Sequence, residues 1–294
     1  MLPARKVLVD TDPCFFGWGL DLDDGLAILF LLGSPEVEVV GVTTTYGNSF
    51  LSVTDRDARL LLARAGRKHI PVHRGAGFFH RDNRPTDASR FLAEAVRREP
   101  GELTLLTLGP LTNVAAAAAS DPSFARGLRE LVMMGGRAAT GASEFNFRQD
   151  PAAASAVLAL PCPKVEITFD ICFGVAITAG DVDVLCAAKE STVSGNAARL
   201  RRFVSVQKTF RHRHGWDHGS ARGGFHPWDV IAAAWLVAPG LFGGVRESSV
   251  SVDADGRSRV GPWDGSGAPV RIPATLDAGR FRTLFLDRVP RVRP

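Results

Sequence analysis

The stretch KVLVDTDPCFFGWGLDLDDGLAILFLLGSPE, residues 6–36, places acidic side chains directly beside apolar ones. Its start, KVLVD, is typical of a strand, and DGLAILFLLG is typical of a helix that the following Ser-Pro sequence ends. Five aspartates lie at or between these segments: Asp10, Asp12, Asp21, Asp23 and Asp24. The sequence therefore concentrates negative charge at a strand–helix junction beside the expected core.

Short β-branched runs alternate with helix-like segments along the rest of the chain. We expect strands at residues 6–10, 37–45, 70–75, 102–109, 130–136 and 164–170, and helices at 24–33, 49–66, 87–99, 110–120, 151–160 and 227–239. Residues 248–261 are expected to form a hairpin that turns at Asp255-Gly256. This alternation favours an α/β fold with a mainly parallel central sheet and helices on both faces. Since no repeat or long linker divides the chain, we expect residues 1–294 to form a single domain.

The composition argues against several other classes of protein. Of the 294 residues, 45% are hydrophobic and 22% are charged, as in a globular protein with a large core. The net charge of +4 comes from scattered basic residues, mostly arginine, without the pattern of a nucleic-acid-binding surface. The longest apolar run, residues 26–32, is too short to cross a bilayer, and the start leaves no room for a signal peptide. We therefore expect a cytoplasmic protein that binds neither nucleic acid nor membrane.

The aspartates are expected to meet at the carboxyl ends of the strands, where parallel α/β sheets bind their ligands. Asp10 and Asp12 point to the same side of the first strand, Asp23 and Asp24 open the next helix, and Asp229 opens a late helix. Carboxylates about 4–5 Å apart repel by roughly 3–4 kcal/mol per pair at an effective dielectric near 20. A hard cation such as Ca²⁺ or Mg²⁺, bound through oxygen, removes this repulsion, whereas zinc prefers Cys and His. Helix capping explains one such aspartate, but it does not explain the whole group.

Other strand ends carry amide and carboxylate side chains. Asn48 follows the second strand, Leu108 and Asn113 follow another, and Glu144 and Asn146 share one loop. These groups suit a polyhydroxyl ligand such as a sugar. Each is weak on its own, because Asn is common in turns and caps.

Six motifs taken together resemble the nucleoside hydrolases, which are calcium-dependent enzymes that cleave the N-glycosidic bond of ribonucleosides. The motifs are DTDP…DDGLA, VTTTYGN, LGPLTNVA, LVMMGG, EFNFRQDPAAA and PWDVIAAA, and they extend the resemblance from residue 6 to about 290. The resemblance implies a Rossmann-like nucleoside hydrolase fold, a small-molecule ribonucleoside substrate and a bound Ca²⁺. We also expect a homo-oligomer, either a dimer or a tetramer.

The resemblance also implies a role for each matching residue. The metal ligands would be Asp12, Asp24, the carbonyl of Leu108 and Asp229, and Asp12 would take a proton from the attacking water. The ribose would be held by Asp23, Asn48, Met134, Glu144 and Asn146.

The residues around the leaving base depart from the commonest pattern of the family. Many members carry His immediately before the late Asp, whereas this chain carries Trp228. Trp at this position resembles the purine-preferring branch, in which indole stacking on the base assists its departure. His226 is a second candidate for this catalytic role, with a solvent-facing loop histidine as the alternative. The segment 210–224, with His212, His214, Trp216, Asp217 and His218, is either a flap over the base or an exposed basic loop.

Two further departures affect the metal and sugar sites. The family pattern DxDPGxDD has a tripeptide between its acidic pairs, whereas ten residues, 13–22, separate Asp12 from Asp23 here. The resulting insert, CFFGWGLDL (14–22), either brings Trp18 or Phe16 over the site or disturbs the calcium geometry, and its Asp21 creates a second possible DxD with Asp23. In addition, an Asn that contacts the sugar in relatives has no clear counterpart here.

Two alternatives remain open from the sequence. One is a magnesium-dependent phosphohydrolase of the haloacid dehalogenase type, which also begins with a strand that ends in DxD. That family expects Thr or Val after the motif, whereas Pro13 and Cys14 follow it here. The other is a non-catalytic homologue that binds a nucleoside or ribose while the insert prevents the chemistry.

Overall fold

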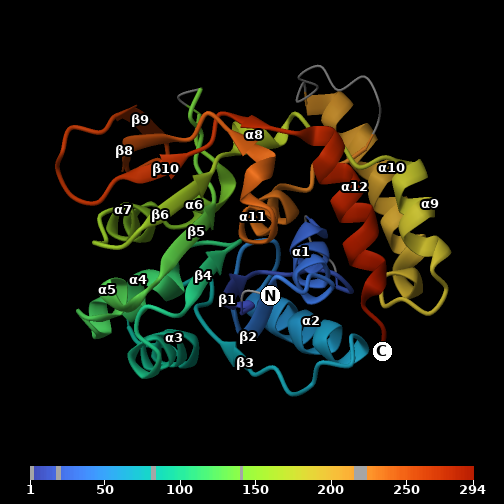
Figure 1. The fold of residues 1–294 in the computed structure, drawn as a ribbon, viewed down its shortest axis with the longest axis horizontal. Coiled ribbons are helices and arrows are strands. Elements are labelled where there is room, and N and C mark those ends of the chain that lie inside the picture. Colours follow the sequence, from blue (N-terminus) through green and yellow to red (C-terminus); the bar gives the residue numbers. More distant parts are fainter. Residues whose placement is uncertain (1–2, 18–20, 81–83, 140–141, 215–223) are drawn as a thin grey trace.

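A nine-stranded sheet forms the centre of the molecule, in the order β3-β2-β1-β4-β5-β6-β10-β8-β9 (Figure 1). The computed structural model describes residues 3–17, 21–80, 84–139, 142–214 and 224–294, with 206–214 described by their backbone alone. The strands are β1 (Arg5–Thr11), β2 (Val37–Thr44), β3 (Val72–Arg74), β4 (Thr104–Thr107), β5 (Glu130–Met134), β6 (Lys164–Ile167), β8 (Arg246–Val252), β9 (Ser258–Pro262) and β10 (Val270–Ile272). Neighbouring strands from β3 to β10 are parallel. Strand β8 pairs antiparallel with β10, and β9 pairs antiparallel with β8. The short strands β7 (Phe242–Gly243) and β11 (Thr275–Leu276) pair separately.

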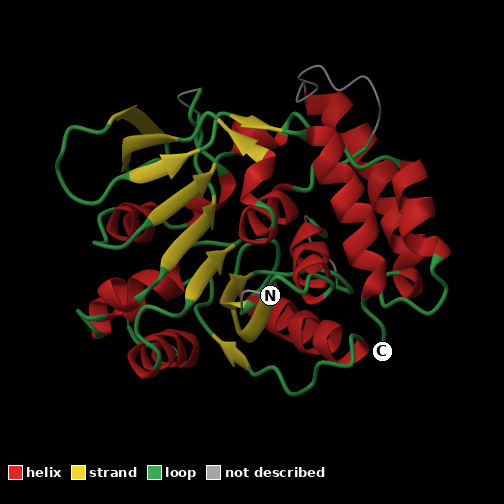
Figure 2. Ribbon diagram, in the orientation of Figure 1, coloured by secondary structure: helices red, strands yellow, loops and turns green. Residues whose placement is uncertain are grey.

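Helices cover both faces of the sheet, as Figure 2 shows. On one face, Val7 and Val9 of β1 join a buried cluster with residues of α1, α2, α11 and α12, and on the other Leu8 joins a second cluster with α3, α4 and α7. The larger helices are α1 (Asp23–Leu32), α2 (Leu51–Arg64), α3 (Asp87–Arg98), α4 (Thr112–Ser120), α7 (Pro151–Leu158), α9 (Ala179–Ala187), α10 (Ala197–His214), α11 (Trp228–Val237) and α12 (Ala278–Arg288). Short ones are α5 (Phe124–Gly127), α6 (Phe145–Gln149) and α8 (Phe169–Cys172). The α/β class, the mainly parallel sheet and its two covered faces are thus confirmed.

Several expected elements are shorter than the sequence suggests. The strand expected at 70–75 is reduced to Val72–Arg74, since Pro71 has no N–H for the ladder. The strand expected at 164–170 ends at Ile167, and α8 begins two residues later. The hairpin is confirmed: Gly256, with φ +77°, donates its N–H to the Asp253 carbonyl at 3.0 Å. Among the described residues, every helix is too short or too polar to cross a lipid bilayer.

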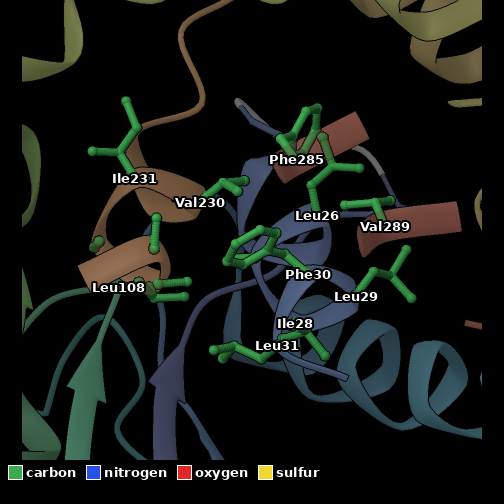
Figure 3. Packing of buried hydrophobic residues seen from close by; sticks show 14 of the residues in the cluster. Leu26, Ile28, Leu29, Phe30, Leu31, Leu108, Val230, Ile231, Phe285 and Val289 are labelled. Carbon is green, nitrogen blue, oxygen red and sulfur yellow. The ribbon is translucent and has the colours of Figure 1, made fainter. Parts of the chain in front are cut away.

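Helix α1 occupies the centre of the larger core. Figure 3 shows its Leu26 and Phe30 packed among Val230 of α11 and Phe285 of α12. Residues from Asp23 to Leu31 are all buried, which accounts for the nearly continuous apolar sequence of this helix. Because α1 packs along α11, the acidic first turns of the two helices are brought together.

Candidate active site

Four aspartates meet at the carboxyl end of β1, and we refer to Asp12, Asp23, Asp24 and Asp229 as the aspartate cluster. Carboxylate oxygens of Asp23, Asp24 and Asp229 all lie within 4.8 Å of one another. Asp23 also accepts the backbone N–H of Asp229 at 3.0 Å. None of the four is more than 4% exposed. Residues more than 200 positions apart in the chain, Asp23 and Asp229, therefore share one buried site.

Asp12 joins the cluster through Asp24 and Asn48. Its backbone N–H donates to Asp24 Oδ1 at 3.2 Å, and the same oxygen accepts the Thr11 hydroxyl at 2.5 Å. Asn48 donates its backbone N–H to Asp12 Oδ2 at 2.6 Å and its side-chain amide to Asp24 Oδ2 at 2.7 Å. Asn48 therefore bridges two carboxylates and fixes their orientation.

Two glycines leave the space that the Asp12 carboxylate occupies. A Cβ at Gly109 would lie 2.7 Å from Asp12 Oδ1, and a Cβ at Gly47 would overlap Asp12 Oδ2. Gly47 also has a φ of +153°, which L side chains rarely adopt, so both its backbone conformation and its close approach to Asp12 require glycine. Glycine is thus required in the motifs VTTTYGN and LGPLTN because a larger residue would displace the Asp12 carboxylate.

Burial raises the pKa of every carboxyl group in the aspartate cluster. Burial, and then the charge of Asp24, hold the pKa of Asp12 well above its usual range. Burial and the charges of Asp23 and Asp24 do the same to the pKa of Asp229. Burial and then Asp24 raise the pKa of Asp23 to about 6, and burial also raises that of Asp24. The charged groups that act most strongly on Asp229 are all aspartates, so in the described part of the chain its strongest charged neighbours repel its ionised form.

This donor set fits a hard divalent cation. Asp12 Oδ1 is buried and has no hydrogen-bond partner among the described residues. The peptide Leu108–Gly109 lies beside it, and the Leu108 carbonyl accepts one hydrogen bond, from Asn146 Nδ2 at 2.8 Å. A carbonyl oxygen has two lone pairs, so one remains for a cation. Carboxylate and carbonyl oxygens are the ligands that such ions prefer.

A second group of side chains lies beside Leu108. Glu144 caps α6 by accepting the backbone N–H groups of Asn146 at 2.9 Å and Phe147 at 3.1 Å, and it also accepts that of Gly136 at 3.2 Å. Asn146 Nδ2 reaches the Met134 carbonyl at 3.2 Å as well as the Leu108 carbonyl at 2.8 Å. The structure therefore places Met134, Glu144 and Asn146, three of the residues that the resemblance assigns to the sugar, close to Leu108.

Trp228 belongs to an aromatic group at the start of α11. Its ring stacks on Phe169 with centroids 5.4 Å apart and planes at 13°, and the His226 ring lies 5.6 Å away. The indole Nε1 is buried without a hydrogen-bond partner in the described part of the chain. His226 is 1% exposed and its Nδ1 faces the Val175 carbonyl, so the alternative of a solvent-facing loop histidine is wrong.

The insert is described in part. Asp21 accepts the backbone N–H groups of Leu22 at 2.7 Å and Asp23 at 3.3 Å at the start of α1. Asp23 is the member of this DxD that accepts the backbone N–H of Asp229. Phe16 packs beneath the Arg64 guanidinium of α2, 4.4 Å from its ring centroid. The expectations for Trp18, Trp216, Asp217 and His218, and for the side chains of His212 and His214, lie outside the described residues.

Sequence reasoning missed three residues around the site. Phe169 follows β6 directly, and its place at a strand end is the only signal that could have drawn attention to it. Asp57 and Arg199 lie on α2 and α10 and contact the insert only through the tertiary structure.

Comparison with known proteins gives a consistent result. The family described as inosine-uridine preferring nucleoside hydrolase matches residues 7–283. A probable uridine nucleosidase 2 of Arabidopsis thaliana is 34% identical over 217 residues, which cover 63% of this chain and 65% of the relative. The non-specific ribonucleoside hydrolase RihC of Escherichia coli is 29% identical, over 92% of this chain and 93% of its own. The solved structure of a plant nucleoside hydrolase, the PpNRh1 enzyme, superposes with a TM-score of 0.82 at 28% identity, over 98% of this chain and 99% of its own.

The match over nearly the whole chain explains why the six motifs gather at one end of the sheet. The chain belongs to the nucleoside hydrolase family, and it is an enzyme that hydrolyses the N-glycosidic bond of ribonucleosides.

Proposed function

We propose that this hydrolase depends on Ca²⁺ held by Asp12, Asp24, Asp229 and the carbonyl of Leu108. The observation that carries the proposal is Asp12 Oδ1, which is buried without a hydrogen-bond partner among the described residues and lies beside carboxylates that repel one another. Ca²⁺ accepts six to eight oxygen ligands, which leaves room for water and sugar hydroxyls. When bound, the ion supplies charge neutralisation and lowers the pKa of a coordinated water.

Asp12 is the proposed general base. Its Oδ2 is fixed by the Asn48 N–H at 2.6 Å, and this leaves Oδ1 to accept a proton from the attacking water. The backbone N–H of Asn48 therefore orients the carboxylate of the proposed base.

The ribose is proposed to lie between Asp23 and Asn48 on one side and Met134, Glu144 and Asn146 on the other. Asp23 is buried beside Asp229, and Glu144 is buried at the start of α6. Two anchored walls orient a sugar for in-line attack. Carboxylates around it favour the positive charge that develops on the ribose more than the neutral ground state, and this lowers the barrier.

The base is proposed to stack on Trp228, with purines preferred over pyrimidines. Two observations support this. Trp228 directly precedes Asp229, a proposed calcium ligand, and the Trp228 ring is partly buried against Phe169. His226 is the alternative group for assisting departure of the base. Its Nδ1 donates to the Val175 carbonyl, so a proton would leave from Nε2. Relatives named as uridine or non-specific hydrolases make this base preference the part that most needs measurement.

A panel of ribonucleosides tests the proposal. Purified protein is incubated with inosine, adenosine, guanosine, uridine or cytidine, and free ribose is measured with and without EGTA. We expect release that EGTA and Asp24→Ala both abolish, with faster release from purine nucleosides. Ribose release that persists in EGTA contradicts the calcium site, and faster release from uridine contradicts the base preference.

The family match argues against both alternatives from the sequence, the phosphohydrolase and the non-catalytic binder.

Residues 1–294 are proposed to act as one catalytic domain, because the site draws on elements from β1 to α11. A cytoplasmic role in purine salvage and a dimeric or tetrameric state are proposed with it. Light scattering of the purified protein checks the subunit number.

A further inference from the structure

We propose that Arg199 and Asp57 are positioning residues that hold the insert and thereby fix the carboxylates of the aspartate cluster. The insert is a departure of this chain from its family pattern, and the proposal rests on the calcium site proposed above. The contacts lie in the first part of the insert, residues 14–17, which two side chains from the distant helices α2 and α10 hold in place.

The Asp57 carboxylate of α2 binds the backbone N–H groups of the insert. Its Oδ2 accepts the backbone N–H of Phe16 at 2.6 Å and of Gly17 at 2.7 Å. Asp57 is 0% exposed, and its other oxygen, Oδ1, pairs with Arg56 at 2.9 Å. A buried carboxylate that accepts two backbone N–H groups fixes a local turn more firmly than a neutral acceptor does.

The Arg199 guanidinium of α10 binds the backbone carbonyl groups of the same segment. Its guanidinium donates to the carbonyls of Cys14 at 3.0 Å and Phe16 at 3.2 Å, and also to that of Gly17. The planar guanidinium presents several donors in a fixed geometry, which a lysine cannot reproduce. Amides and carbonyls of one short segment are therefore held by opposite charges from two helices.

The held segment adjoins the aspartate cluster on both sides. Cys14 lies two residues after Asp12, so its fixed carbonyl limits the movement of the Asp12 backbone. Phe15 is 1% exposed and packs on Gly25, where an added Cβ would overlap its ring. Since Gly25 follows Asp24 directly, the ring restrains the first turn of α1. Displacement of residues 14–17 would thus separate two proposed calcium ligands.

The comparison of Arg199→Ala with Arg201→Ala tests this role. Arg201 lies on the same helix, is half-exposed and pairs with Asp183 at 2.8 Å, so its removal controls for loss of a guanidinium from α10. Calcium affinity of the chelated protein is measured by calorimetry, together with kcat, KM and the melting temperature. We expect Arg199→Ala to weaken calcium binding about 10- to 100-fold, as loss of a group behind a metal ligand does. Arg201→Ala should leave calcium affinity within about twofold of the wild type, since a surface substitution changes little.

Two milder variants keep the test decisive if Arg199→Ala does not fold. Arg199→Lys keeps the positive charge but loses the planar guanidinium. Asp57→Asn keeps the shape of the side chain but loses its negative charge. Both variants should bind calcium more weakly than the wild type. A lower melting temperature with unchanged calcium affinity and kcat in these variants overturns the positioning role. Wild-type ribose release that is insensitive to EGTA overturns the calcium site itself, which is a different result from an unaffected variant.

Discussion

Two buried acidic regions of this enzyme differ in how their negative charge can be neutralised. The aspartate cluster gathers several carboxylates around one point, with oxygens of three of them within 4.8 Å. Glu166 of β6 is a single carboxyl group, 0% exposed, and neither of its oxygens has a hydrogen-bond partner among the described residues. Burial, followed by the charges of Glu144 and Asp170, raises the pKa of Glu166 to about 8. A cluster can be neutralised by a divalent ion, whereas an isolated buried carboxyl group is neutralised by a proton.

Glu166 also shows how closely such a group can be packed. Gly136, with φ +67°, lies against it, and an added Cβ there would overlap Glu166 Oε1. The same Gly136 donates its N–H to Glu144 at 3.2 Å. Glu166 therefore lies directly behind a residue that is proposed to hold the ribose.

The largest expected effect comes from breaking the cluster. Asp24→Ala removes a proposed calcium ligand, the acceptor of the Thr11 hydroxyl and the partner of Asn48. We expect kcat/KM for the best ribonucleoside to fall by about 10³-fold or more, the scale on which loss of a preorganised electrostatic group acts. Steady-state kinetics checks this, with Asp287→Ala, an exposed aspartate of α12, as the control. Equal activity of the two variants would contradict the metal role of Asp24.

Glu166 gives a pH-dependent effect on stability. Its pKa is about 8 in the folded protein against a usual value of 4.5, so the folded state holds a proton that the unfolded state releases. The contribution of Glu166 to the free energy of unfolding should therefore be highest below pH 4.5 and should fall by a few kcal/mol as the pH rises through about 8.

Glu166→Gln checks this prediction because it fixes the neutral form. Urea unfolding of the wild type and the variant at pH 5 and at pH 8.5 should show that the substitution raises the free energy of unfolding much more at the higher pH. Glu94→Gln, on the exposed surface of α3, is the matched control. A gain of the same size at both pH values would show that Glu166 is not protonated in the folded state.

The smallest expected effect comes from a residue outside both acidic regions. Trp228→Ala should weaken kcat/KM for inosine and guanosine by about 10- to 100-fold, in line with 1–3 kcal/mol of stacking, and should affect uridine less. Trp263→Ala removes an indole that is 40% exposed and bonded to the Ser266 carbonyl at 3.0 Å, and it serves as the control. Equal losses on purine and pyrimidine nucleosides would show that Trp228 only supports the packing.

The sequence predicted the parts of the fold that depend on local pattern. The structure has strands β1, β2, β4 and β5 and helix α1 within or close to their expected ranges. These elements depend on the spacing of apolar residues and on helix-breaking residues, and both are local features of the sequence. Strand β10 and helices α9, α10 and α12 were not expected. β10 has only three residues, Val270–Ile272, and it owes its place to pairing with β6 about a hundred residues earlier.

The candidate site divides in the same way. The meeting of Asp12, Asp24 and Asp229 follows from the strand-end rule for parallel sheets, so the sequence was enough to anticipate it. The contacts of Phe169, Asp57 and Arg199 depend on how helices pack across the sheet, which no spacing in the sequence encodes. Asn48 was expected at the sugar, and the structure adds that its amide bridges Asp12 and Asp24.

Calcium titration of the chelated enzyme tests the central claim most directly. The wild type at neutral pH should bind one Ca²⁺ per chain, and Asp229→Asn, which removes one charge from the aspartate cluster, should bind it far more weakly. Absence of calcium binding by the wild type, or equal affinity of the two proteins, would contradict a cation site at the aspartate cluster.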